Sequence, residues 1–179
     1  MAYDLGPENA LIFRITHRDN VPWILDHGIQ CRNSTEVDPN FVAIGMRDLI
    51  ERRRAHHVRC RLGGTLADYV PYRTVAKLGL PFVFTDRHAV LSTAQVFSDL
   101  RELDKIDWAV IRRRDFRRDP EDPGKVERYE AEALIHRHVP INSLYGIACY
   151  NDDVKRILVE KVNERNVKLD IATKPNRYF

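Results

Sequence analysis

The chain has 179 residues, and its 44% hydrophobic and 31% charged residues are typical of a folded protein with a buried core, not of a disordered chain. No apolar run approaches the roughly 18 residues that a membrane span needs, and residues 1–10 lack the apolar core of a secretion signal. The formal net charge of +3 is too small to indicate a nucleic-acid binder by itself. We therefore expect one cytoplasmic domain over residues 1–179 that does not contact a membrane.

The three cysteines, Cys31, Cys60 and Cys149, are far apart in the sequence. In a reducing cytoplasm such residues are expected to be free thiols. No CxxC or HxxxH pair sets up the ligand spacing of a zinc site. We expect neither a disulfide nor a metal ion.

The chain opens with a predicted strand and a short helix. Residues 10–16 (ALIFRIT) are apolar and β-branched, which favours a strand. Asp19 or Asn20 then caps the helix, with Pro22 in its first turn and Gly28 just past its end.

The next part of the chain predicts a loop, a basic helix and a second strand. Residues 33–40 have the Asn, Ser, Asp and Pro content of a loop. Residues 47–57 form a basic helix that ends by the Gly63-Gly64 pair. The segment 80–85 (LPFVFT) is the second strand.

A longer helix is expected to begin at Asp86, because apolar residues then recur every third position along one stripe. These residues are Leu91, Ala94, Phe97, Leu100 and Leu103. Residues 106–111 predict another short helical turn. Residues 115–125 predict a loop, because they are rich in Asp, Pro and Gly.

The last third of the chain predicts three strands and a helix. Residues 129–136 (YEAEALIH) form a strand on which Glu130, Glu132 and Leu134 share one face. The other elements are a strand over 145–150, a helix over 152–165 capped by Asn151, and a strand over 167–172. Because the chain lacks regular βαβ alternation, an α+β fold with a largely antiparallel sheet is favoured.

Two stretches are crowded with arginine. They contain Arg52, Arg53, Arg54, Arg59 and Arg61, with His56 and His57 between them, and then Arg112, Arg113, Arg114, Arg117 and Arg118. Such clusters can hold phosphates, and equally they can be solvated basic faces. Charge alone leaves both interpretations open.

Glu132 is the most unusual candidate residue. It lies between Ala131 and Ala133 in an apolar strand, where a carboxylate is costly unless it is paired or faces a cleft. One interpretation is a structural salt bridge to an arginine. The other is a carboxylate at the floor of an active site, with small neighbours that leave room for a ligand.

Two junctions between a strand and a helix could bind an anion or a ribose. In the first, residues 16–20, Asn20 is equally well explained as a helix cap. In the second, residues 85–88, His88 is either catalytic or structural. The sequence has no GxSxG elbow, Walker A loop or GxGxxG fingerprint.

Four stretches, taken in order, resemble the DarT family of DNA ADP-ribosyltransferases. They are residues 12–29 (IFRITHRDNVPWILDHGI), 50–72 (IERRRAHHV followed by LGGTLADYVPY), 79–91 (GLPFVFTDRHAVL) and 128–140 (RYEAEALIHRHVP). The resemblance covers nearly the whole chain. It implies a PARP-like fold in which two small, mostly antiparallel sheets, flanked by short helices, enclose an NAD cleft.

The resemblance also implies positions for NAD, which is a substrate in this family. Arg14, Ile15 and Thr16 would line the nicotinamide and its ribose. The segment 33–53 would close over NAD.

Arg53 matches the family's catalytic arginine, and its place suggests contact with NAD as well. Glu132 matches the catalytic glutamate. His88 opens the segment, ending at Glu132, that presents the target nucleotide. The implied activity is a pentosyltransferase, a toxin that modifies a base in single-stranded DNA, closer to the thymidine than to the guanosine branch. A macrodomain antitoxin is the partner expected from the family.

This chemistry suits the residues. Breaking the bond between nicotinamide and ribose builds positive charge on the ribose, and a fixed carboxylate such as Glu132 can stabilise it. Arginine is a poor base, so Arg53 is expected to hold the NAD phosphates or to polarise the target base.

The chain departs from the family after Tyr72. A piece about two strands long is missing there, and residues 73–78 connect almost directly to the next strand. In the family this piece contacts DNA. A second hypothesis is therefore an inactive remnant that binds nucleic acid or a protein partner. A third is a nuclease-like RNA-binding toxin that uses the arginine clusters with His56 or His57.

Overall fold

The computed structural model describes residues 13–72 and 80–175, which group into two compact units. The first unit contains residues 31–33 and the described part of 45–137, together with residues 13 and 14. The second contains residues 15–30, 34–44 and the described residues from 138 onward. The expected single domain over 1–179 stays a prediction, and each unit is described by itself.

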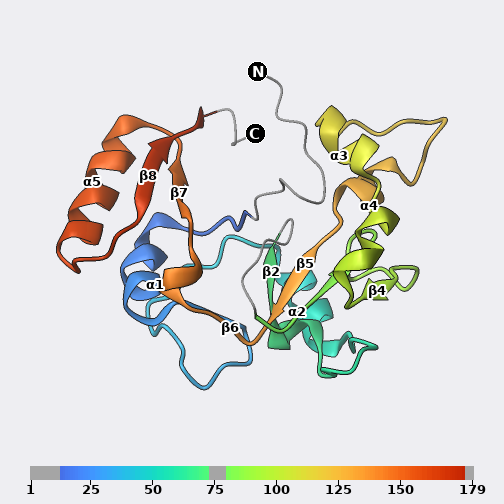
Figure 1. Ribbon diagram of the computed structural model, residues 1–179, viewed down its shortest axis with the longest axis horizontal. Coiled ribbons are helices and arrows are strands. Elements are labelled where there is room, and N and C mark those ends of the chain that lie inside the picture. The colour runs from blue at the N-terminus through green and yellow to red at the C-terminus, as the bar shows by residue number, and fades with distance from the viewer. Residues whose placement is uncertain (1–12, 73–79, 176–179) are drawn as a thin grey trace. The chain divides into compact units, whose positions relative to one another are not determined.

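The first unit is built on an antiparallel sheet of four strands in the order β2-β5-β3-β4. The strands are β2 (Tyr69–Tyr72), β3 (Phe82–Thr85), β4 (Val96–Phe97) and β5 (Ala133–His136). In the register, Phe84 of β3 faces Ala133 of β5. The helices of this unit are α2 (Arg47–Ala55), η2 (Leu66–Asp68), η3 (Leu100–Lys105), α3 (Trp108–Arg113) and α4 (Lys125–Tyr129). Figure 1 shows β2 and β5 side by side.

The core of the first unit consists of two clusters that use opposite faces of β3. Val83 packs in a cluster with Leu66, Tyr69 and Leu134. The next residue, Phe84, packs in the other cluster with Trp108. Successive strand residues point to opposite faces, so β3 divides the core between the two sides of the sheet.

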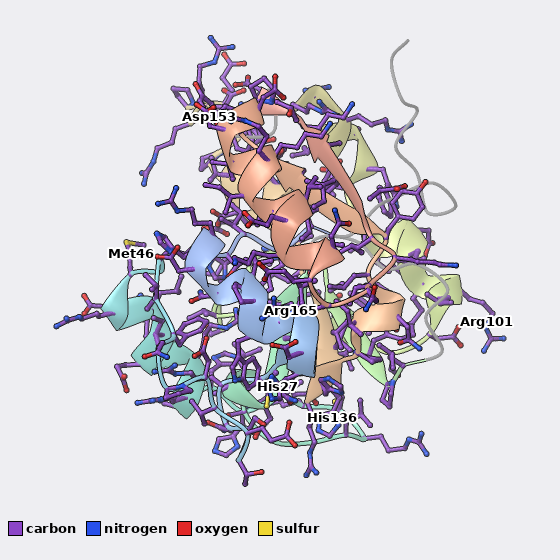
Figure 2. The ribbon with its side chains drawn as sticks, turned by 90° about the vertical axis from the view of Figure 1, so that its left-hand side faces the viewer. His27, Met46, Arg101, His136, Asp153 and Arg165 are labelled. Atoms are coloured by element: carbon purple, nitrogen blue, oxygen red, sulfur yellow. The ribbon has the colours of Figure 1, made fainter. Side chains whose placement is uncertain are left out.

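The second unit combines a parallel and an antiparallel strand pair. Its elements are η1 (Arg18–Asn20), α1 (Val21–His27), β1 (Ile29–Gln30), β6 (His138–Val139), η4 (Ile141–Ser143), β7 (Gly146–Cys149), α5 (Asp152–Asn163) and β8 (Asp170–Thr173). Strands β7 and β8 are parallel and connected by α5, while β1 and β6 are antiparallel. Arg165, labelled in Figure 2, pairs with Asp26 of α1 at an Nε–Oδ1 distance of 2.8 Å.

Much of the element order expected from the sequence is confirmed. Helix α1 lies between Asn20 and Gly28, and residues 33–40 form a loop. Asn151 caps α5 by accepting a hydrogen bond from the amide of Val154. The α+β fold with small, mostly antiparallel sheets is confirmed as well. Of the expected strand over 10–16, residues 10–12 lie outside the described part, and the rest shows only a bridge at Phe13.

The prediction of a helix that begins at Asp86 is wrong. Residues 86–95 form bends and turns, followed by β4 and η3. The Asp86 carboxylate accepts a hydrogen bond from the amide of Gln95, and the Glu132 carboxylate accepts one from the amide of Ala89. These side-chain acceptors hold the backbone in a non-helical conformation, which a periodic apolar pattern does not reveal.

Several element boundaries also differ from expectation, among them the start of β8 at Asp170 and of α3 at Trp108. The strand expected over 129–136 begins only at Ala133, because the amides of Glu130 and Ala131 still bond back to carbonyls of α4. Glu130 therefore does not share a strand face with Glu132. Helix α2 ends at Ala55, well before the glycine pair, because the carbonyl of the next residue, His56, accepts a hydrogen bond from the amide of Leu66.

Candidate active site

Glu132 lies just before β5 and continues its pairing with β3. The amide of Thr85 donates to the carbonyl of Glu132 at 2.8 Å, and the amide of Glu132 donates to the Thr85 hydroxyl at 3.2 Å. The Thr85 side chain is buried. The backbone of Glu132 is thus fixed from both sides by the last residue of β3.

Three cationic or N–H donors converge on the Glu132 carboxylate. Nη1 of Arg53 lies 2.9 Å from Oε2 and 3.2 Å from Oε1. Nδ1 of His88 lies 3.2 Å from Oε1, and the amide of Ala89 donates to the same oxygen at 3.1 Å. The side chains of Glu132, Arg53 and His88 are only 11%, 14% and 22% exposed. The structure therefore brings together three of the residues singled out from the sequence.

Of the three consecutive arginines in helix α2, only Arg53 faces the Glu132 carboxylate. Successive helical residues point about 100° apart, so Arg53 faces the carboxylate while Arg52 and Arg54 face solvent. Arg54 pairs instead with Glu51, at an Nη1–Oε1 distance of 3.0 Å. The interpretation as a solvated basic face therefore applies to Arg52 and Arg54 but not to Arg53.

The electrostatics keep Glu132 ionised. Burial by itself would raise the pKa of Glu132, but the hydrogen bond from His88, the charges of Arg53 and His88, and the Ala89 amide lower it to about 2. The hydrogen bond to Glu132 raises the pKa of His88 against the opposing effect of burial. The site therefore favours a carboxylate beside an imidazolium.

One nitrogen of Arg53 has no hydrogen-bond partner in the described part of the chain. Its Nη2 is buried and makes no hydrogen bond with any residue that the structure describes. An unsatisfied buried donor costs free energy, and a guanidinium nitrogen can donate to a phosphate or a carbonyl oxygen. The arginine can therefore hold Glu132 with one nitrogen and a substrate oxygen with the other.

A small cavity borders Glu132 within the first unit. Its lining residues are Phe84, Thr85, Leu103, Ile106, Trp108, Ile111, Ala131, Glu132 and Ala133. Its volume of about 20 Å³ has room for roughly one water molecule. It is too small for a nucleotide, so we do not assign a substrate to it.

The residues expected to line the nicotinamide fall in different units. Arg14 belongs to the first unit, and Ile15 and Thr16 belong to the second. Ile15 is 62% exposed, and the Thr16 hydroxyl accepts a hydrogen bond from the Asn20 side chain at 3.1 Å. Their role towards NAD stays a prediction.

Sequence reasoning missed the parts played by Thr85 and Ala89. Both lie in the segment TDRHA, at a junction where only His88 was singled out. The signal was available, since a short polar residue at a strand end commonly bonds neighbouring backbone. What the sequence could not show is that the amide of Ala89 turns towards Glu132.

The hypothesis of a nuclease-like toxin gains no support from the described residues. In residues 13–72 and 80–175, no group of three or more His, Cys, Asp or Glu side chains is arranged to hold a metal ion. Neither His56 nor His57 has a carboxylate partner within these ranges, and burial together with the charges of Arg53 and Arg59 lowers the pKa of His56. None of the described helices is both long and apolar enough to span a membrane.

Comparison with known proteins gives one consistent result. A family model described as "ssDNA thymidine ADP-ribosyltransferase, DarT" matches residues 13–73 and 72–179. A DNA ADP-ribosyl transferase from Escherichia coli O127:H6 is 42% identical over 217 residues, which cover 100% of both chains. Thermus sp. 2.9 DarT in complex with ADP-ribosylated ssDNA superposes with a TM-score of 0.84 at 27% identity, covering 94% of this chain and 95% of that one. The same protein in complex with NAD+ gives a TM-score of 0.79 at 26% identity, covering 94% and 96%.

The family match is interrupted where the sequence departs from the family. Its two parts meet at residues 72–73, directly after β2. The alignment with the Escherichia coli relative spans 217 positions, and 217 less the 179 residues of this chain leaves 38 positions without a residue here.

Proposed function

Because the chain belongs to the DarT family of single-stranded DNA thymidine ADP-ribosyltransferases, we propose that it transfers ADP-ribose from NAD to a thymidine base in single-stranded DNA. In this reaction the bond between the ribose C1′ and the nicotinamide nitrogen breaks, and its electron pair leaves with nicotinamide. A ring nitrogen of the base forms the new bond to C1′ and loses its proton to solvent. The chain is therefore a pentosyltransferase for which NAD is a substrate.

The observation that carries this proposal is the buried, ionised carboxylate of Glu132. As the bond to nicotinamide breaks, the ribose develops positive charge, and a preorganised carboxylate stabilises it. Oε1 already accepts from His88 and Ala89, whereas Oε2 accepts only from Arg53 in the described structure. We assign Oε2 to a ribose hydroxyl.

Arg53 supplies the matching donor. Its buried Nη2 suits a phosphate of NAD or a carbonyl oxygen of the target base, while Nη1 holds Glu132. A guanidinium stays charged at the pH of the reaction, so Arg53 polarises and positions but does not accept the proton. We assign Glu132 and Arg53 as the catalytic residues.

The remaining assignments follow from the family. Arg14, Ile15 and Thr16 line the nicotinamide and its ribose, and His88 opens the segment that presents the target nucleotide. His88 also holds Glu132 in place, which the sequence alone did not suggest. We further propose that the protein is a cytoplasmic toxin of a single domain, countered by a macrodomain partner.

The test is incubation with labelled NAD and single-stranded oligonucleotides that differ only in containing T, G, C or A at one position. The proposal expects label on the T oligonucleotide. Label on the G oligonucleotide alone would move the chain to the guanosine branch. NAD binding without transfer to any oligonucleotide would support the inactive remnant, which the 38 absent positions favour.

A further inference from the structure

Asn20 lies at the N-cap position of helix α1, but its side chain does not cap the helix. Asparagine usually caps a helix by accepting from the second or third helical amide. Here Pro22 is the second helical residue and has no amide hydrogen to donate. The third helical residue, Trp23, has an amide but does not donate it to Asn20 either, so the carboxamide of Asn20 is available for another partner.

That partner is the backbone of Val42. Oδ1 of Asn20 accepts from the Val42 amide at 2.8 Å, and Nδ2 donates to the Val42 carbonyl at 2.9 Å. Nδ2 also donates to the Thr16 hydroxyl at 3.1 Å. Asn20 is 1% exposed, so three of its hydrogen-bonding positions are used in a nearly water-free place. All these residues belong to the second unit.

The first part of segment 34–44 is also bonded to Gln30, through the side chains of Ser34 and Glu36, whereas the part around Val42 has few buried apolar side chains. Residues 34–44 contain no helix or strand. Of residues 41–44, only Val42 is partly buried, while Phe41 and Ile44 are 40% and 53% exposed. A segment with few buried apolar contacts depends on its polar contacts for a defined position.

We propose that Asn20 is a positioning residue for NAD: it fixes segment 34–44, through Val42, beside Thr16 before NAD binds. The proposal rests on the proposed function, in which Thr16 lines the nicotinamide ribose and this segment closes over NAD. A protein that populates its binding-competent state only in part binds its ligand more weakly by that fraction. Loss of the hydrogen bonds between Asn20 and Val42 should therefore weaken NAD binding and leave the chemistry of bound NAD unchanged.

The test compares Asn20→Ala with Asn151→Ala, and uses Asn20→Asp as a second variant. Asn151 is also a helix N-cap of the second unit, but its side chain does cap its helix, so it controls for a general loss of stability. Asn20→Asp keeps the shape and the acceptor for the Val42 amide and loses both donated bonds. If Asn20→Ala folds poorly, Asn20→Asp decides.

Two measurements are made on the full-length protein. Hydrogen exchange without NAD should show faster exchange over residues 36–44 in the Asn20 variants and not in Asn151→Ala. In the transfer assay, the KM for NAD should rise about 10- to 100-fold in the Asn20 variants, with kcat within about threefold of wild type.

An unchanged KM in a folded Asn20 variant, or an equal rise in Asn151→Ala, would overturn the proposal even if exchange becomes faster. Unchanged exchange over residues 36–44 would overturn it as well. If the wild-type protein binds no NAD in calorimetry, the proposed function fails, and the role towards NAD fails with it. In that case the exchange data still decide separately whether Asn20 fixes the segment.

Discussion

Nη1 of Arg53 contacts both carboxylate oxygens of Glu132, at 2.9 and 3.2 Å, although the two residues are 79 positions apart in the sequence. Arg53 comes from α2 and Glu132 from the residue before β5. A structural salt bridge and a catalytic pair share this geometry, so the two interpretations differ only in what happens when one partner is replaced.

Glu132→Gln separates these interpretations. The amide keeps the shape of the side chain and one acceptor oxygen but loses the charge that stabilises the developing cation. We expect ADP-ribose transfer to fall by at least about 100-fold while the protein stays folded. Transfer rates and melting temperatures are measured together. A folded variant that retains most of its activity would contradict the assigned role, and unfolding of both Glu132→Gln and Glu132→Ala would favour the structural salt bridge.

Arg53→Ala should lower kcat/KM for NAD by more than about tenfold, because it removes the cation beside Glu132 and the buried Nη2 donor. Arg52→Ala and Arg54→Ala are the matched controls, since both side chains are exposed on the same helix. Their effects should stay within about twofold. Equal, small losses from all three variants would mean that α2 carries a solvated basic face and no catalytic arginine.

The chemistry of this site was easier to predict than its architecture. A carboxylate between two alanines before an apolar run marked Glu132 from the sequence alone. The choice of Arg53 among three adjacent arginines depended on family resemblance, because helical phase cannot be oriented without knowing what the helix faces. The contact from Ala89 had no sequence signal, since backbone amides carry none.

The fold was likewise predictable where local contacts determine it, and not where long-range contacts do. Helix α5 was predictable because Asn151 caps it through a local bond to Val154. The region after Asp86 was not, because its backbone is held by Glu132, 43 residues beyond Ala89. Asn20 was expected to cap a helix, and its actual partner, Val42, lies 22 residues away.

The imidazole of His88 and the carboxylate of Glu132 should shape the dependence of stability on pH. Glu132 has a folded pKa of about 2, below its ordinary 4.5, so its stabilising contribution is complete above 4.5 and is lost as the pH falls towards 2. His88 has a folded pKa above its ordinary 6.5, so its contribution is complete below 6.5 and is lost as the pH rises through the folded pKa. Both contributions are complete between pH 4.5 and 6.5.

Melting curves across pH test this window with His88→Gln, which is neutral at every pH used. The difference in melting temperature between wild type and His88→Gln should be largest below pH 6.5 and should shrink at higher pH. A difference that is constant from pH 5 to pH 9, or one that grows with pH, would contradict a charged His88 beside Glu132.

The absent segment should affect DNA modification more than NAD binding. Among the described strands, β2 pairs with β5 alone, so it is an edge of the four-stranded sheet, and the family match is interrupted directly after it. The resemblance to the family predicts that the absent piece would contact DNA, and each base stacked on an aromatic side chain contributes about 1–3 kcal/mol to binding. We expect the loss of such contacts to weaken DNA binding by orders of magnitude, whereas the Arg53–Glu132 pair is present in this chain. We therefore expect NAD binding in calorimetry together with weak thymidine modification.

The sharpest comparison is a chimera that carries the corresponding segment of the Escherichia coli relative after Tyr72. It should modify DNA faster with an unchanged affinity for NAD, whereas robust modification by the natural chain would show that the segment is dispensable.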